Sequence, residues 1–191
     1  DDAEGDGVEP RLPMVVDAHV HLFPPKLFEA IWRWFDTHGW PIRYKLHADQ
    51  VVAFLRARGV RHMVALHYAH KAGMAEAMNE FMRETAARHP DVTGLATVFP
   101  GEPGSGAIVD RAIESGLRGV KLHCHVQCFA PDEDRLEAVL AAFEDFGLAD
   151  VAETDWVALA EVAATTRPEE IDPFDAASLI FALSRPSLRD I

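Results

Sequence analysis

The sequence predicts an α/β fold in which helices cover a parallel β-sheet, and two observations support this prediction. The first is a repeated order of segments: between residues 14 and 147, a short apolar segment with strand character is followed four times by a segment with helical periodicity. The second is composition, because the 191 residues are 49% hydrophobic and 26% charged, as in an ordinary globular protein. Alternating strands and helices build parallel sheets, and right-handed crossovers place successive strands side by side.

The predicted strands are short runs rich in β-branched residues, and the clearest of them alternates polar and apolar positions. That first strand ends at Pro24–Pro25, where the chain loses backbone donors. The third ends at the glycine- and proline-rich loop 100–106. The four predicted strands cover residues 14–22, 60–67, 92–99 and 117–126.

The predicted helices follow these strands and show apolar residues three and four positions apart. Asp49 is a plausible N-cap of the second helix, and Gly59 and Gly116 stand where a C-terminal glycine commonly ends a helix. The predicted helices cover about 26–38, 49–58, 71–89, 107–115 and 131–146.

The alternation of strands and helices fails after Gly147. Residues 148–151 are few for a strand, residues 155–165 and about 174–184 show helical patterns, and no fifth clear strand follows. A complete (β/α)₈ barrel takes roughly 250 residues, so about half of one is expected here. The predicted fold class is therefore TIM-barrel-like β/α repeats, with about four units of a partial or incomplete barrel and an irregular helical C-terminal segment.

The formal net charge of −13 is concentrated at the two ends of the chain. We expect a disordered acidic leader over 1–13, a β/α domain over 14–148 and an acidic helical tail over 149–191. Such a charge repels phosphate backbones and anionic lipid, which argues against nucleic-acid and membrane partners. No run approaches the roughly 18 apolar residues of a membrane helix, and two cysteines cannot build a disulfide framework. A cytoplasmic location is the expectation.

The strongest chemical signal is Asp17-Ala18-His19-Val20-His21, at the end of the first strand. A period of two puts His19 and His21 on one face, at the carboxyl end of a parallel strand, where such sheets bind ligands. Two neutral imidazoles placed in this way can chelate a divalent ion of the zinc class. The alternative is a pair of surface histidines without a role.

A second signal is Gly119-Val120-Lys121-Leu122-His123-Cys124-His125. Alternation puts Lys121, His123 and His125 on one face of the fourth strand, where buried polar groups need partners. The alternative places His125 past the strand end, in solvent, and pairs Lys121 with a carboxylate. The tryptophans and phenylalanine between Trp32 and Trp40 can line a pocket over the first strand, although helical core packing is the simpler account.

Two segments, VVDAHVHLFPP and GLRGVKLHCHVQCFAPDEDRLEAVLAAFEDFGL, resemble the amidohydrolase superfamily. The resemblance is to its amidohydrolase-related (amidohydrolase 2) branch of metal-dependent hydrolases, which includes lactonases and nonoxidative decarboxylases. It covers roughly residues 14–148, the first half of that family's barrel. It implies a (β/α)₈ scaffold with a divalent metal, most commonly zinc, at the carboxyl-end mouth.

The resemblance also implies roles for particular residues. His19 and His21 match the first-strand metal ligands, and His123 is the next candidate ligand or substrate contact. Lys121 falls where some branches carry a carboxylated lysine that bridges two metals, and it is otherwise a candidate anion clamp. The usual chemistry is attack of metal-bound water on an amide, ester or lactone of a small molecule, with a last-strand aspartate as base. Asp155, in Thr154-Asp155-Trp156, faintly resembles that last-strand motif.

The sequence departs from the family on the later strands, because no histidine follows His125 to match the family's fifth- and sixth-strand histidines. An alternative hypothesis is therefore a catalytically inactive half-barrel that serves as an assembly module. An open four-stranded sheet exposes two edges and an apolar face, so this hypothesis predicts a homodimer. A third hypothesis is a metal-binding protein without turnover.

Overall fold

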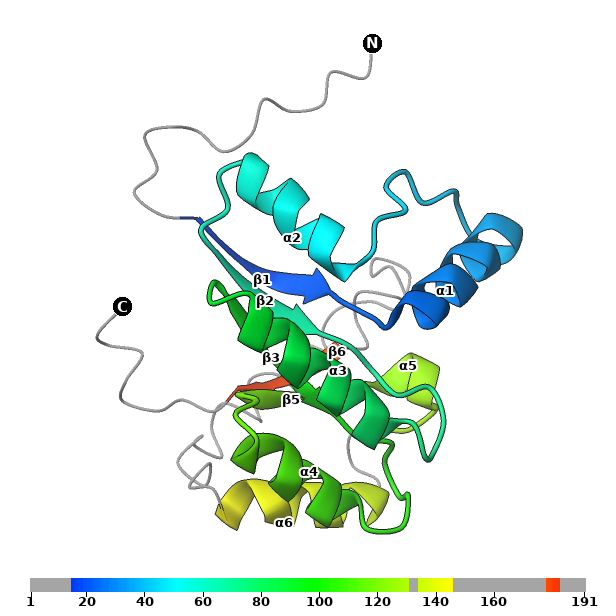
Figure 1. Ribbon diagram of the computed structural model, residues 1–191. Coiled ribbons are helices and arrows are strands. Elements are labelled where there is room, and N and C mark those ends of the chain that lie inside the picture. Colours follow the sequence, from blue (N-terminus) through cyan, green and yellow to red (C-terminus); the bar gives the residue numbers. More distant parts are fainter. Residues whose placement is uncertain (1–14, 131–133, 146–177, 183–191) are drawn as a thin grey trace, which may run out of the picture.

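The computed structural model describes residues 15–130, 134–145 and 178–182 (Figure 1). Its strands form two three-stranded sheets, in the orders β1-β2-β3 and β4-β5-β6. Every strand pair among β1 to β5 is parallel, and helices lie over the sheets. The predicted α/β fold with TIM-barrel-like repeats is confirmed, and the described residues form no closed barrel.

The first unit contains β1 (Val16–His21), α1 (Pro25–His38) and α2 (Ala48–Ala57). Helix α1 begins at Pro25, a residue whose fixed φ and missing N–H suit the first helical position. The prediction that Asp49 is the N-cap of the second helix is wrong. His47 is the N-cap of α2, and its backbone N–H donates to Gln50 Oε1 at 2.9 Å. Gly59 follows α2 with a φ of +91°, as expected of a residue that ends a helix.

The predicted strand 92–99 is two strands in the structure. β3 (Val92–Gly94) pairs with β2 (His62–Leu66), whereas β4 (Ala96–Thr97) pairs with β5 (Gly119–His123). The chain changes neighbours here, and the side chain of Asn79 takes the place of a strand at Thr97. Its amide accepts from Thr97 N–H at 2.7 Å and donates to Thr97 O at 2.9 Å.

The predicted strand 117–126 is too long at its carboxyl end. β5 stops at His123, and residues Cys124–Gln127 form the short helix α5. His125 is therefore exposed on a helix rather than on the strand face of Lys121 and His123, as the alternative interpretation had it. The change of structure is fixed by Gln127, whose Oε1 accepts the His123 backbone N–H at 2.7 Å.

β6 (Ser178–Ala182) runs antiparallel to β5, so the helix predicted over 174–184 is wrong at these residues. The run Ser-Leu-Ile-Phe-Ala is too short for periodicity to separate helix from strand, and the edge of β5 gives it backbone partners. One of the two sheet edges expected to be open is thereby covered. The leader 1–13 and the helix predicted over 155–165 lie outside the described residues.

The remaining helices are α3 (Ala75–Arg88), α4 (Ser105–Glu114), a 3₁₀ turn (Asp134–Leu136) and α6 (Glu137–Asp145). Helix α6 lies against α4 (Figure 1), and Gly106 allows the close approach. A Cβ at Gly106 would come within 2.9 Å of the Ala138 carbonyl oxygen, so a side chain there would push the helices apart.

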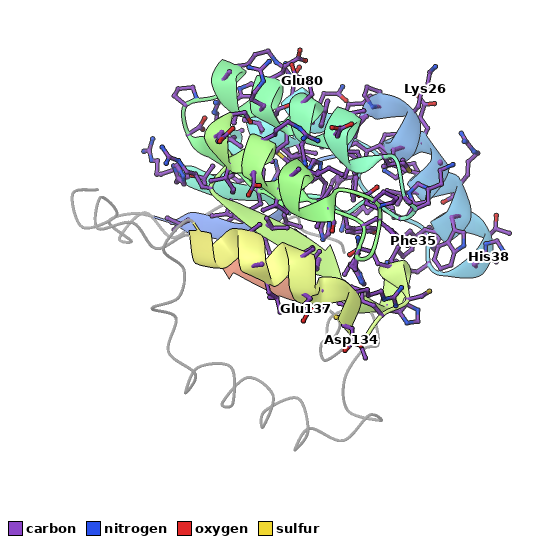
Figure 2. The ribbon with its side chains drawn as sticks, turned by 90° about the horizontal axis from the view of Figure 1, so that it is seen from below. Lys26, Phe35, His38, Glu80, Asp134 and Glu137 are labelled. Atoms are coloured by element: carbon purple, nitrogen blue, oxygen red, sulfur yellow. The ribbon has the colours of Figure 1, made fainter. Side chains whose placement is uncertain are left out.

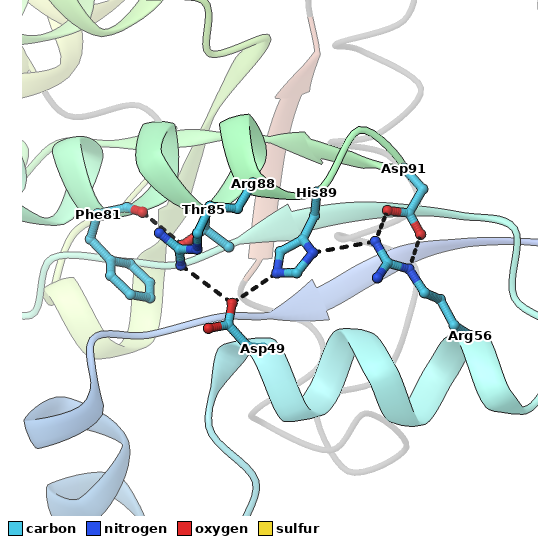
Figure 3. A network of polar contacts seen from close by, with 7 residues as sticks. All are labelled: Asp49, Arg56, Phe81, Thr85, Arg88, His89 and Asp91. Atoms are coloured by element: carbon cyan, nitrogen blue, oxygen red, sulfur yellow. Dashed lines mark hydrogen bonds and ion pairs between the residues drawn. The ribbon is translucent and has the colours of Figure 1, made fainter.

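A polar network joins α2 to the end of α3 and to the turn between α3 and β3, and it runs along α2 from Asp49 to Arg56 (Figure 3). His89 Nε2 lies 2.8 Å from Asp49 Oδ1, and Arg88 lies 3.3 Å from the same oxygen. Arg56 donates hydrogen bonds to both carboxylate oxygens of Asp91, and its Nε lies 2.6 Å from Oδ2. Asp49 therefore serves this network instead of capping α2.

This network predicts that the folded chain loses stability in acid. Hydrogen bonding to His89 lowers the pKa of Asp49, and hydrogen bonding to Arg56 lowers that of Asp91. Their stabilising contribution is therefore present above the ordinary carboxyl pKa of about 3.9 and is lost as pH falls through the lowered values. In the variant Asp49→Asn/Asp91→Asn, the free energy of unfolding measured by urea denaturation should depend less on pH below about 4 than in the wild type. At pH 7 the loss of the Asp49 contacts should cost less than about 1 kcal/mol, because the Asp49 side chain is mostly exposed. If the variant lost stability in acid as steeply as the wild type, this assignment would be contradicted.

Candidate metal and substrate site

Five basic side chains gather at the carboxyl ends of three strands. His19 and His21 belong to the end of β1, His67 follows β2, and Lys121 and His123 belong to β5. The pKa of His21 is lowered by its burial and then by the charges of the other four, so these four lie within electrostatic reach of His21. This is the end of a parallel sheet at which ligands bind.

The His19 and His21 rings point at each other, with their Nε2 atoms 3.0 Å apart. The pairing of β1 with β2 is irregular between Asp17 and Val20, and the Asp17 carboxylate accepts the His19 backbone N–H at 3.0 Å. Despite this irregularity the two imidazoles converge. Two nitrogens this close to each other can bind one ion together, which is how paired histidines hold zinc.

The imidazoles in the cluster favour the neutral form. Burial lowers the pKa of His21 and of His67 to about 3, and lowers that of His123 to about 4. Neutral imidazole is the form that binds a metal ion, so no proton has to leave these rings at pH 7.

Lys121 and His67 are fully buried, and in the part of the chain that the structure describes Lys121 Nζ makes no hydrogen bond. Burial lowers the pKa of Lys121 to about 8. The expected alternative, in which Lys121 pairs with a carboxylate, is not seen among these residues. A buried amine without a partner is costly, so this position calls for a group that the described chain does not supply.

A pocket of about 340 Å³ opens above the histidine pair. His19, His21 and His123 form part of its lining, and the rest is mainly aromatic and aliphatic. Trp32 and Phe35 line it from α1, so they do more than pack the helix. The aromatic members of the lining are Phe23, Phe28, Trp32, Phe35, Tyr44 and Tyr68.

Sequence reasoning misses Tyr68, which directly follows His67. Its ring meets the His123 ring edge-on with centroids 4.7 Å apart, and the His21 ring at 5.8 Å. Tyr68 therefore separates and orients the two imidazoles. The signal that could have found it is its place just after a strand end, beside a histidine.

Sequence reasoning also misses Gln127, whose side chain is almost fully buried. Its Nε2 donates to the carbonyl oxygens of Ala69 at 2.9 Å and Val98 at 2.7 Å, while its Oε1 accepts the His123 N–H. One amide thus ties together the segments that follow β2 and β4 and the end of β5. No local pattern predicts such a contact, because its partners are far away in sequence.

The structure therefore brings three of the predicted site residues, His19, His21 and His123, to one pocket. Lys121 lies close enough to act on the pKa of His21 but does not line that pocket. Asp155 lies outside the described residues. Over residues 15–130, 134–145 and 178–182, no three His, Cys, Asp or Glu side chains are placed to hold a metal ion. The histidine pair thus fits two ligands of a divalent ion, and a full ligand set needs further groups.

Comparison with known proteins adds a family match over most of the chain. The family model described as Amidohydrolase matches residues 16–183, which extends past residue 148 and includes β6. Neither the search of curated proteins nor the search of solved structures found a match. Among the residues that the structure describes, no helix is both long enough and apolar enough to span a membrane.

Proposed function

Because the chain belongs to the amidohydrolase family, we propose that it is a metal-dependent hydrolase acting on an amide, ester or lactone of a small molecule, or a related nonoxidative decarboxylase. The observation that carries the proposal is the convergence of His19 Nε2 and His21 Nε2 to 3.0 Å beneath a pocket. His19 and His21 would hold a divalent ion, with zinc as the proposed metal, and that ion would supply Lewis acidity for the activation of water.

His123 is better suited to contact substrate than to bind the metal. Its Nδ1 accepts the backbone N–H of Val126 at 3.4 Å. In the neutral ring the proton is then on Nε2, which makes Nε2 a donor rather than a metal ligand. We assign His123 to donate a hydrogen bond to a substrate oxygen in the pocket.

The other residues have supporting roles in the proposal. The aromatic wall excludes water and packs the apolar part of a substrate. Lys121, which is fully buried and close enough to act on the pKa of His21, would hold an anionic group or, once its amine is carboxylated, would help to hold a second ion. Asp155 is the proposed base, on the resemblance alone. Both cysteines, Cys124 and Cys128, are free thiols, in keeping with the proposed cytoplasmic location.

The second candidate is a catalytically inactive module that binds metal or assembles with a partner. One observation favours it: the described residues bring together only two clear ligands, His19 and His21.

Turnover separates these two candidates. The zinc-loaded chain should hydrolyse members of a panel of small esters, lactones and amides, or decarboxylate a member of a panel of carboxylic acids. A chelator should abolish this activity and added zinc should restore it, since the metal supplies the Lewis acid. Activity that survives chelation would contradict the metal-dependent mechanism. A zinc-loaded chain inactive on every panel would favour the inactive module.

A further inference from the structure

The first β/α unit contains one more helix than the units that follow it. A single helix, α3, joins β2 to β3, and a single helix, α4, joins β4 to β5, whereas both α1 and α2 lie between β1 and β2. Helix α2 lies alongside β1 and β2, and α1 lies beyond the carboxyl end of β1 (Figure 1). Helix α1 and the connection 39–47 are therefore an addition to the first unit, and they come directly after the strand that carries the histidine pair.

This addition builds most of the apolar wall of the histidine pocket. Phe35 lies toward the rest of the fold, whereas Lys26 and His38 of the same helix point away from it and are exposed (Figure 2). The side chains that contribute to the wall stand at helical spacing on α1 and at every second position of the connection. They include Ile31, Trp32 and Phe35 from α1, and Ile42, Tyr44 and Leu46 from the connection.

A continuous row of rings joins the histidines to this wall. The Tyr68 ring has its centroid 4.7 Å from that of His123 and 5.1 Å from that of Phe23. Phe28 continues the row, with its ring centroid 5.4 Å from that of Phe23 and 5.5 Å from that of Trp32. Rings that touch a neighbour on both sides lose little freedom when a ligand arrives, so the wall is a preformed surface for an apolar group.

The pocket offers no partner for a charged group at the end formed by the addition. Among the residues that the structure describes, its lining contains no Asp, Glu, Lys or Arg. Arg43 and Lys45 alternate with the lining residues of the connection but are not part of the lining, and Lys45 Nζ lies 2.6 Å from Asp36 Oδ2. A charge buried against this wall would lose its hydration without compensation, so the wall selects an uncharged group.

We propose that α1 and the connection 39–47 form a specificity pocket, which binds an uncharged apolar group of about the size of a phenyl ring. This group belongs to the substrate and lies beside the part that reacts at the histidines, so the inference rests on the proposed function. A dry cavity of about 150 Å³ can hold benzene. The pocket of about 340 Å³ therefore has room for one ring and for the reacting group next to it.

The first test measures binding and needs no turnover. Benzyl alcohol, ethanol and 4-(hydroxymethyl)benzoate are titrated into the zinc-loaded chain, and binding is followed by nuclear magnetic resonance. Benzyl alcohol should bind at least about tenfold more tightly than either of the other two, because only its ring is both apolar and uncharged. Equal binding of benzyl alcohol and ethanol, or tightest binding of the charged probe, would overturn the proposal.

Two tryptophans of α1 provide a matched pair of variants. Trp32→Ala removes part of the wall and should weaken the binding of benzyl alcohol about fivefold or more. Trp34→Ala removes the same side chain two residues later, at a position that is 44% exposed and outside the lining, and should leave the binding unchanged. Equal effects of the two variants would contradict the proposal.

Ile42→Trp tests the same claim without the loss of a ring. The larger side chain occupies the space of the ligand and should also weaken the binding of benzyl alcohol, and circular dichroism shows that each variant is folded. If Trp32→Ala does not fold, Ile42→Trp decides the outcome, and wild-type binding by this variant would overturn the proposal.

Turnover separates a failure of this inference from a failure of the proposed function. Ethyl phenylacetate and ethyl acetate share a leaving group, and kcat/KM should be at least about tenfold higher for the phenyl ester. Trp32→Ala should reduce this ratio, and Trp34→Ala should not. Zinc-dependent turnover without the preference would overturn the inference and leave the proposed function standing. Trp32-dependent binding of benzyl alcohol, in a chain that is inactive on every panel, would support the pocket and favour the inactive module.

Discussion

The variant His19→Ala/His21→Ala is expected to lose the bound zinc. The two imidazole nitrogens lie 3.0 Å apart and are the proposed pair of metal ligands. Loss of a residue that only orients a metal ligand commonly weakens metal binding 10- to 100-fold, so removal of two ligands should exceed about 100-fold. Zinc content after dialysis and a calorimetric titration of the metal-free chain measure the effect.

The matched control for this variant is His38→Ala/His125→Ala, which removes two exposed imidazoles outside the pair. It should retain zinc with wild-type stoichiometry, because neither ring lines the pocket. Circular dichroism should show both double variants folded. Undiminished zinc in His19→Ala/His21→Ala would remove the proposed site.

The largest effect on stability is expected from Gln127→Leu. Leucine has about the volume of glutamine but leaves three buried backbone groups without partners: the Ala69 and Val98 carbonyls and the His123 N–H. An unpaired buried group costs about 1–3 kcal/mol, so the free energy of unfolding should fall by about 3 kcal/mol or more. Equilibrium urea denaturation at neutral pH measures this loss.

Gln50→Leu is the control for this substitution. Gln50 is exposed and accepts a single backbone N–H, from His47, so its loss should cost about 1 kcal/mol or less. If Gln127→Leu were no more destabilising than Gln50→Leu, the amide would not hold the three strand ends together. A loss of zinc affinity with unchanged stability would equally contradict this role.

The elements that the sequence predicts well are those whose signals are local. The alternation around His19 and His21 identifies β1, and the apolar spacing after Pro25 identifies α1. Where the sequence prediction fails, distant residues decide the structure. The strand 92–99 splits because β3 and β4 have different neighbours, and residues 178–182 become a strand because β5 offers an edge.

The same contrast applies to the candidate site. The convergence of His19 with His21 follows from their spacing, and His123 follows from the resemblance and the strand pattern. Tyr68 and Gln127 could not be predicted, because their roles rest on contacts between the ends of separate strands. Burial of Lys121 without a hydrogen-bond partner among the described residues is also invisible in one sequence, since it depends on every element packed around β5.

Anomalous diffraction at the zinc edge, from crystals of the zinc-loaded chain, tests the central claim most directly. The account predicts a peak at bonding distance, about 2.1 Å, from the Nε2 atoms of both His19 and His21. A zinc peak elsewhere in the molecule would contradict it. So would a structure in which the His19 and His21 rings point away from each other and no zinc lies between them.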